Sequence, residues 1–245
     1  MIHVIHLRGT NEPLVPAGIS RTFLDALDRD RFHITTPTYP ADYGQHVSFL
    51  ESNRAGREAV LNQIRSTPMP VVLTGYSAGA FIMGDLAAEI AASEFDDILP
   101  SRVLAVALLA DPKRPEGEGA PGIPTPGGYG IAGQRSIRDI LTFWGTASAD
   151  PISALGADNP LRSAADLTAA FTTDPRGWDE WAQDMVIKLV RRQYQPWWMF
   201  WLRPGRWGEA IAALNGYLFQ GLHTRSYLDE RVCTRLAAVV NREVL

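Results

Sequence analysis

Apolar residues in the first half of the chain recur as short, nearly uninterrupted runs, as in strands buried on both faces of a parallel sheet. Between the runs lie segments in which apolar residues have helical spacing. This alternation predicts a doubly wound, mostly parallel α/β sheet. The predicted strands are Ile2–Leu7, Phe32–Thr36, Val71–Thr74, Val103–Ala110 and Ile137–Trp144, and the predicted helices are Ile19–Leu27, Ser48–Ser66 and Ala78–Ala92.

The stretch Asp111–Arg135 interrupts this alternation. It holds seven glycines and five prolines, so neither a helix nor a strand can run through it. A loop of this length inside a compact domain is usually functional or mobile. Because it follows the carboxyl end of a predicted strand, we expect it to form one wall of a cleft.

The pattern after residue 158 changes to helices, with Asp229–Glu243 as a closing helix. We therefore predict a core of residues 1–153 and 221–245 and a helical insertion of residues 154–220. Six of the seven tryptophans fall between Trp178 and Trp207. We expect these rings to fill the core of the insertion or to line a surface for an acyl chain. The helices predicted in the insertion are Leu161–Phe171, Trp178–Arg192 and Glu209–Phe219.

Composition narrows the classes of partner. The chain has 245 residues, is 46% hydrophobic and carries a net charge of -4, which gives no reason to expect nucleic acid or a membrane surface as a partner. Its single cysteine, Cys233, cannot form an intrachain disulfide. No apolar run reaches transmembrane length, and the first run lacks the features of a signal peptide. We expect a monomer that is made in the cytoplasm without a signal peptide.

The clearest chemical motif is Gly75-Tyr76-Ser77-Ala78-Gly79, placed between a predicted strand and a predicted helix. A Gly-x-Ser-x-Gly turn in this position forces the serine into strained backbone angles and exposes its hydroxyl at the carboxyl edge of the sheet. The amino end of the following helix favours negative charge there. Ser77 is therefore the candidate nucleophile.

A serine nucleophile needs a base, and in sheets of this kind the partners follow in the order serine, acid, histidine. Of the five histidines only His223 lies after Ser77, in a short loop before the closing helix. His3 and His6 face opposite sides of a strand, so they form a poor metal pair and are expected to be packed or hydrogen-bonded. His223 is the candidate base.

Three aspartates are candidates for the acid that orients the histidine. Asp150 follows the predicted strand Ile137–Trp144 through a loop of small residues and is our first choice. Asp166, in a predicted helix, and Asp111, at the end of the preceding strand, stay open as alternatives.

The oxyanion of a tetrahedral intermediate needs two N–H donors. The N–H of Ala78 directly follows the nucleophile, and Thr10 lies in the glycine-containing loop after the first strand. Such chemistry requires no metal or organic cofactor.

Several of these motifs resemble a known family. Arg8-Gly9-Thr10-x-Glu12 and Gly75-Tyr76-Ser77-x-Gly79-Ala80 are similar to motifs of the cutinase-like serine esterases. Asp111-Pro112-x-Arg114-Pro115 and Gly130-Ile131-Ala132-Gly133 resemble, more narrowly, the lysin B enzymes of phages that infect mycobacteria.

This resemblance implies an α/β-hydrolase core without a lid domain and a helical insertion between acid and histidine. It implies Ser77, Asp150 and His223 as catalytic triad, with Thr10 and Ala78 at the oxyanion hole. The implied reaction is cleavage of the ester between mycolic acids and arabinogalactan, at the cell envelope after release from the host. The lack of a disulfide favours a phage lysin over a secreted cutinase. Ala149 stands where the family has glycine before the acid, which keeps Asp166 as a rival.

Two other functions remain as alternatives. One is a cellular cutinase-like lipase or esterase that acts on acylglycerols. The other is a catalytically inactive hydrolase fold that binds the envelope.

Overall fold

The computed structural model describes residues 1–162, 205–218 and 220–245, and a five-stranded sheet lies at its centre. The strands follow the spatial order β2-β1-β3-β4-β5, and every neighbouring pair is parallel. This confirms the predicted parallel α/β sheet. The strands are β1 (Ile2–Leu7), β2 (Phe32–Thr35), β3 (Val71–Tyr76), β4 (Val103–Leu109) and β5 (Leu141–Gly145).

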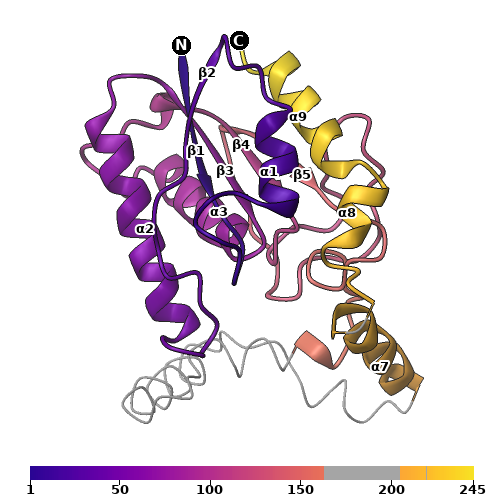
Figure 1. The fold of residues 1–245 in the computed structure, drawn as a ribbon. Helices are drawn as coiled ribbons and strands as arrows, with labels where there is room; N and C mark the ends of the chain where they lie inside the picture. The colour runs from indigo at the N-terminus through magenta and orange to yellow at the C-terminus, as the bar shows by residue number, and fades with distance from the viewer. Residues whose placement is uncertain (163–204, 219) are drawn as a thin grey trace.

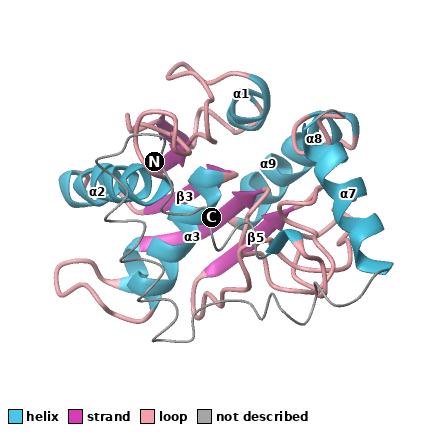
Figure 2. Ribbon diagram, turned by 90° about the horizontal axis from the view of Figure 1, so that it is seen from below, coloured by secondary structure: helices cyan, strands magenta, loops and turns pink. Residues whose placement is uncertain are grey.

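Helices cover both faces of this sheet. Figures 1 and 2 show α2 and α3 on one face and α1 and α9 on the other. Each face has its own apolar core, with Ile64 and Leu86 in one and Phe23 and Leu236 in the other. The sheet is therefore doubly wound. The described helices are α1 (Gly18–Asp25), α2 (Phe49–Ser66), α3 (Ala78–Ala91), the short 3₁₀ helix η1 (Pro100–Arg102), α7 (Gly205–Leu218), α8 (Arg225–Asp229) and α9 (Val232–Glu243).

The order of the strands reverses between β1 and β3. The chain leaves β1 for its neighbour β2 and then returns to the other side of β1 as β3. Loops that follow the two strands at such a point diverge and leave a crevice at the carboxyl edge of the sheet. Leu7 and Gly75 are in register at this edge. The fold thus brings the loop after β1 next to the Gly-x-Ser-x-Gly turn.

Two predicted elements are interrupted by residues in the left-handed region. The predicted strand Ile137–Trp144 begins only at Leu141, because Asp139 has a φ of 58°. The predicted helix Asp229–Glu243 is divided between α8 and α9, because Arg231 has a φ of 55°. Neither a strand nor a right-handed helix continues through such an angle. In addition, α7 begins at Gly205 rather than at Glu209.

Much of the predicted insertion of residues 154–220 falls outside the described residues. This applies to most of the predicted helix Leu161–Phe171, to all of Trp178–Arg192 and to Asp166. The boundaries of the insertion therefore stay a prediction. No helix in the described ranges combines the length and the apolar character needed to span a bilayer.

Candidate active site

The turn between β3 and α3 holds Ser77 in unusual backbone angles, with φ 54° and ψ -115°. The two glycines of this turn are needed because a side chain at either position would collide with nearby backbone atoms. A Cβ on Gly79 would lie 2.1 Å from the carbonyl oxygen of Leu7, and one on Gly75 would lie 2.4 Å from the carbonyl carbon of Gly79. Only glycine fits at both positions, so strand and helix meet closely and Ser77 projects from the sheet edge, partly exposed to solvent.

Three distant side chains form a continuous path of hydrogen bonds at this edge. Ser77 Oγ lies 2.8 Å from His223 Nε2, and His223 Nδ1 lies 2.9 Å from Asp150 Oδ1. Asp150 follows β5, and His223 precedes α8. The structure therefore brings together three of the residues singled out in the sequence.

The Asp150 carboxylate is fully buried and has several further donors. Its Oδ2 accepts from the Tyr227 hydroxyl at 2.6 Å and from the Ser153 hydroxyl at 2.7 Å, while its Oδ1 accepts from the Ile152 N–H at 3.0 Å. Burial acts to raise the pKa of Asp150, but the charge of His223 and these hydrogen bonds outweigh it. The net result is a lowered pKa.

The charge on Asp150 determines which nitrogen of His223 carries the proton. An ionised carboxylate only accepts hydrogen bonds, so His223 Nδ1 donates to it. In the neutral ring, Nε2 then accepts a hydrogen bond from the Ser77 hydroxyl through its lone pair. This tautomer can remove a proton from Ser77.

Two tyrosines that the sequence analysis did not single out fix these groups. Besides Tyr227, which bonds to Asp150, the Tyr76 hydroxyl donates to the carbonyl oxygen of His223 at 2.9 Å. The Tyr76 and His223 rings stack with centroids 5.3 Å apart. Tyr76 occupies a variable position of the Gly-x-Ser-x-Gly motif, and no periodicity in the sequence connects Tyr227 with Asp150.

Thr10 and Ala78, the predicted oxyanion donors, flank Ser77 from two elements. Ala78 is the first residue of α3, where backbone N–H groups lack partners within the helix. Thr10 lines the same pocket as Ser77 and His223. This pocket has a volume of about 380 Å³ and is lined by Thr10, Asn11, Glu12, Pro13, Ala17, Gly18, Ile19, Tyr76, Ser77, His223 and Thr224.

A chain of polar side chains, half-buried at Glu12 and buried at His6, holds the loop that carries Thr10. The Glu12 carboxylate accepts from the Gly9 N–H at 2.7 Å and from the Ser20 hydroxyl at 2.6 Å. Ser20 Oγ in turn lies 2.9 Å from His6 Nε2, and His6 Nδ1 lies 3.0 Å from the Thr74 hydroxyl. Burial lowers the pKa of His6 to about 3, so its ring is neutral and these bonds have one consistent direction.

The hydrogen-bonded role predicted for His6 is thereby confirmed. His3 is likewise bonded, with its Nε2 2.7 Å from the Thr35 hydroxyl. Neither ring belongs to a cluster that could hold a metal within the residues that the structure describes.

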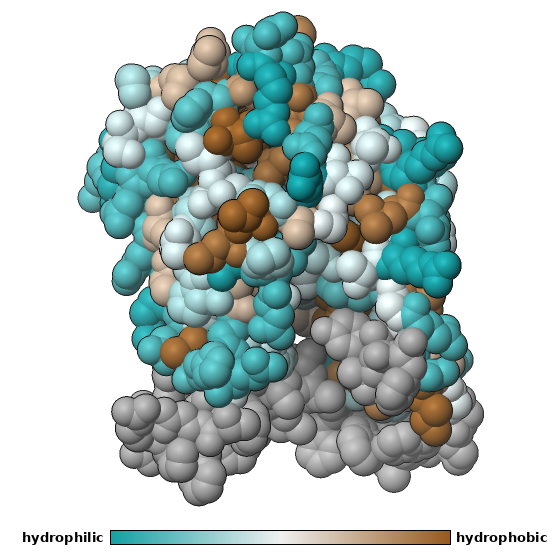
Figure 3. Space-filling view, in the orientation of Figure 1, coloured by the Kyte–Doolittle hydropathy of each residue, from teal (hydrophilic) through white to brown (hydrophobic). Residues whose placement is uncertain are grey.

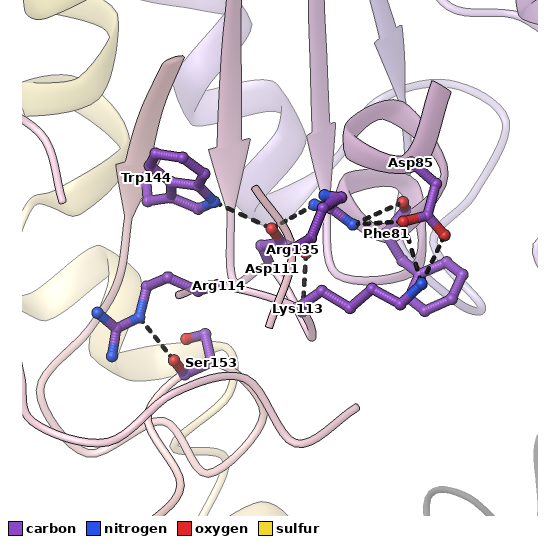
Figure 4. Close-up of polar contacts among 8 residues, drawn as sticks. All are labelled: Phe81, Asp85, Asp111, Lys113, Arg114, Arg135, Trp144 and Ser153. Carbon is purple, nitrogen blue, oxygen red and sulfur yellow. Dashed lines mark hydrogen bonds and ion pairs between the residues drawn. The ribbon is translucent and has the colours of Figure 1, made fainter. Parts of the chain in front are cut away.

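Asp111, an alternative acid, is bonded elsewhere, as Figure 4 shows. Its Oδ2 accepts from the Arg135 guanidinium at 2.5 Å and from the Trp144 indole N–H at 3.0 Å. Arg135 also pairs with Asp85 at 2.9 Å, and Lys113 pairs with Asp85 at 2.8 Å. This cluster ties the start and the end of the stretch 111–135 to α3.

Arg114 organises the middle of the same stretch. It is fully buried and donates to the carbonyl oxygens of Ser153 at 2.7 Å, Glu118 at 2.8 Å and Gly128 at 2.7 Å. A buried guanidinium needs this many acceptors, so the loop folds around it. Contrary to our expectation of a cleft wall, the pocket at Ser77 takes none of its described lining from residues 111–135.

Comparison with known proteins shows that this chain is similar to solved structures. No family model and no curated protein matches the sequence. Lysin B from Mycobacteriophage D29 matches with a TM-score of 0.55 and 16% identity over 87% of this chain and 89% of that one. The chain has the α/β-hydrolase fold.

Two further structures match less well in geometry. The catalytic core domain of acetyl xylan esterase from Trichoderma reesei has a TM-score of 0.47 and 23% identity, over 76% of this chain and 95% of that one. A cutinase-like protein from Cryptococcus sp. has a TM-score of 0.47 and 18% identity, over 79% and 95%. The fold that this chain shares with lysin B from Mycobacteriophage D29 agrees with the resemblance seen in the sequence.

We predict that Tyr227→Phe weakens folding in a pH-dependent manner. A lowered pKa of Asp150 stabilises the folded state above the unfolded-state pKa, and this contribution is lost as pH falls through the folded-state value. Without the Tyr227 hydroxyl the pKa of Asp150 is lowered less. We expect the free energy of unfolding to fall by about 1–3 kcal/mol at pH 7, and this loss to shrink as pH falls below 3.8 and through the lowered pKa of Asp150, measured by urea unfolding from pH 7 to about pH 2.

Tyr39→Phe is the matched control. Tyr39 is also buried, but its hydroxyl donates to the carbonyl oxygen of Arg8, which does not titrate. The decrease in the free energy of unfolding caused by Tyr39→Phe should therefore be the same at every pH. A pH-independent loss in Tyr227→Phe as well would contradict the assigned coupling to Asp150.

Proposed function

We propose that the protein is a serine esterase in which Ser77 is the nucleophile, His223 the general base and Asp150 the acid that orients His223. One observation carries this proposal, namely the hydrogen-bond path with steps of 2.8 and 2.9 Å from Ser77 through His223 to a buried carboxylate. A nucleophile, a base and an orienting acid in this arrangement suit acyl transfer.

The first half-reaction forms an acyl-enzyme. Ser77 Oγ attacks the ester carbonyl carbon while His223 Nε2 takes the hydroxyl proton. The Asp150 carboxylate stabilises the resulting imidazolium through Nδ1–H. The tetrahedral intermediate collapses, the bond to the alcohol oxygen breaks, and His223 returns the proton to the departing alcohol.

The second half-reaction releases the acid. His223 removes a proton from water, the hydroxide attacks the acyl carbonyl, and Ser77 leaves with the proton from His223. In both halves the oxyanion is held by the N–H groups of Ala78 and Thr10. The bonds from Glu12 to Gly9 and Ser20 support this role of Thr10, because they fix the loop beside Ser77.

The substrate is a lipid ester, and the mycolic acid–arabinogalactan ester of the mycobacterial envelope is the specific candidate. The motif around Arg114 resembles that of lysin B enzymes, and the fold matches lysin B from Mycobacteriophage D29. A role in phage lysis, with action at the envelope after release from the host, follows from the same resemblance.

We expect Ser77→Ala to lower kcat/KM for p-nitrophenyl butyrate by at least about 10³-fold, because the variant lacks the attacking oxygen. The release of p-nitrophenol measures this. Ser101→Ala, at an exposed serine beside the amino end of β4, serves as control and should retain the parent rate. Parent-like turnover by Ser77→Ala would rule out the nucleophile and favour an inactive binding module.

The acid is tested by Asp150→Ala and Asp166→Ala in parallel on the same ester. Asp150→Ala should lose about 10²- to 10⁴-fold in kcat, because His223 loses the carboxylate that fixes its tautomer. Asp166→Ala should stay within about twofold of the parent, since the described hydrogen-bond path from Ser77 through His223 ends at Asp150. Loss of activity in Asp166→Ala alone would assign the acid to Asp166.

The substrate is tested by comparing purified mycolylarabinogalactan with a triglyceride emulsion at equal enzyme concentration. We expect release of free mycolic acids, measured by mass spectrometry, with Ser77→Ala as the blank. Fast triglyceride hydrolysis with mycolate release no higher than the blank would point to an acylglycerol esterase.

A further inference from the structure

The connection from β1 to α1 presents two large apolar side chains to solvent. Leu14 is 60% exposed and Val15 is 78% exposed. Between Glu12 and Arg21 the chain carries no charged residue. Neither Leu14 nor Val15 belongs to an apolar core, so burial within this protein does not explain them.

These side chains adjoin the pocket that contains Ser77. Pro13 and Ala17, which flank them in the chain, both line that pocket together with Ser77. Leu14 and Val15 lie between these two residues in the chain, in the connection that follows β1 at the carboxyl edge of the sheet. Figure 3 shows that apolar side chains reach the surface in small groups among hydrophilic ones on the face it presents.

The segment is held in place from both ends. On one side Glu12 is bonded to Gly9 and Ser20, and on the other the carbonyl oxygen of Ala17 accepts from the Arg21 N–H at 3.2 Å at the start of α1. Pro13 and Pro16 bracket the apolar pair and fix their own φ angles, which lowers the entropy lost on binding. An apolar tip that is exposed yet restrained is suited to contact an apolar phase.

We infer that Leu14 and Val15 insert into the acyl-chain layer of an aggregated lipid ester and so bring the pocket at Ser77 to the ester group. The inference rests on the proposed esterase function and adds to it a surface for lipid aggregates. The absence of charge from residues 13–20 favours acyl chains over ionic headgroups as the group contacted. A second copy of this chain is the competing occupant.

The experiment measures adsorption and hydrolysis separately. Adsorption to phosphatidylcholine-stabilised triolein droplets is followed by flotation in the parent and in Leu14→Ser/Val15→Ser. The double variant should adsorb about tenfold or more weakly, because two apolar side chains no longer leave water. Its kcat/KM for dissolved p-nitrophenyl butyrate should stay within about twofold of the parent, while its rate on the droplets falls in step with adsorption.

Leu99→Ser is the matched control. Leu99 is 64% exposed, but it precedes η1 and β4 and therefore lies at the amino edge of the sheet, opposite Ser77. This variant should adsorb like the parent. Equal adsorption by the parent and the double variant, or an equal loss in Leu99→Ser, would overturn the inference.

Sedimentation velocity tests the competing occupant. A parent dimer that the double substitution converts to monomer, with adsorption unchanged, would assign the surface to a second copy and overturn the inference. Failure of the proposed function has a different result, namely no hydrolysis of the dissolved ester by the parent. The adsorption measurement then still decides whether Leu14 and Val15 bind lipid.

Discussion

The buried charge of Asp150 is the constraint on which the site depends. A carboxylate without access to water is tolerated only when donors surround it. Its donors come from the segment after β5, from His223 and from Tyr227 in α8. Satisfying this one charge therefore fixes the segment before α9 against the end of β5. The imidazole is placed beside Ser77 as a consequence.

This constraint extends into the long glycine- and proline-rich loop. Arg114 bonds to the carbonyl oxygen of Ser153, whose hydroxyl bonds to Asp150. Asp111, at the end of β4, neutralises Arg135 at the far end of the same loop. The loop thus supports Asp150 through Ser153 and contributes no described residue to the pocket at Ser77. Its many glycines and prolines suit a backbone that must direct several carbonyl oxygens at one guanidinium.

The features that could be predicted from the sequence are those that local pattern determines. Apolar runs predicted the strands, and the Gly-x-Ser-x-Gly motif predicted the strand, turn and helix around Ser77, since these elements are adjacent in the chain. Chain order alone predicted that His223 is the partner of Ser77, because no other histidine follows the serine. The structure agrees, since it places His223 Nε2 beside Ser77 Oγ. Asp150 was favoured because it follows a strand, although that strand is shorter than its apolar pattern indicated.

The features that could not be predicted depend on contacts between distant residues or on single backbone angles. Tyr227 and Asp150 are 77 residues apart, and nothing local marks them as partners. The left-handed angles at Asp139 and Arg231 fall on residue types that a strand or a helix also accepts. The fold of residues 111–135 around Arg114 likewise follows from burial of that side chain, which composition does not reveal.

The two sides of Ser77 are supported by groups of different charge. On the side of His223, the support is ionic, because Asp150 carries a charge and bonds to the His223 ring. On the side of Thr10, the support passes through His6, whose pKa burial lowers to about 3. His6 therefore stays neutral where an ordinary histidine titrates. The loop beside Ser77 is therefore held by hydrogen bonds that do not change over the pH range in which an ordinary histidine gains its proton.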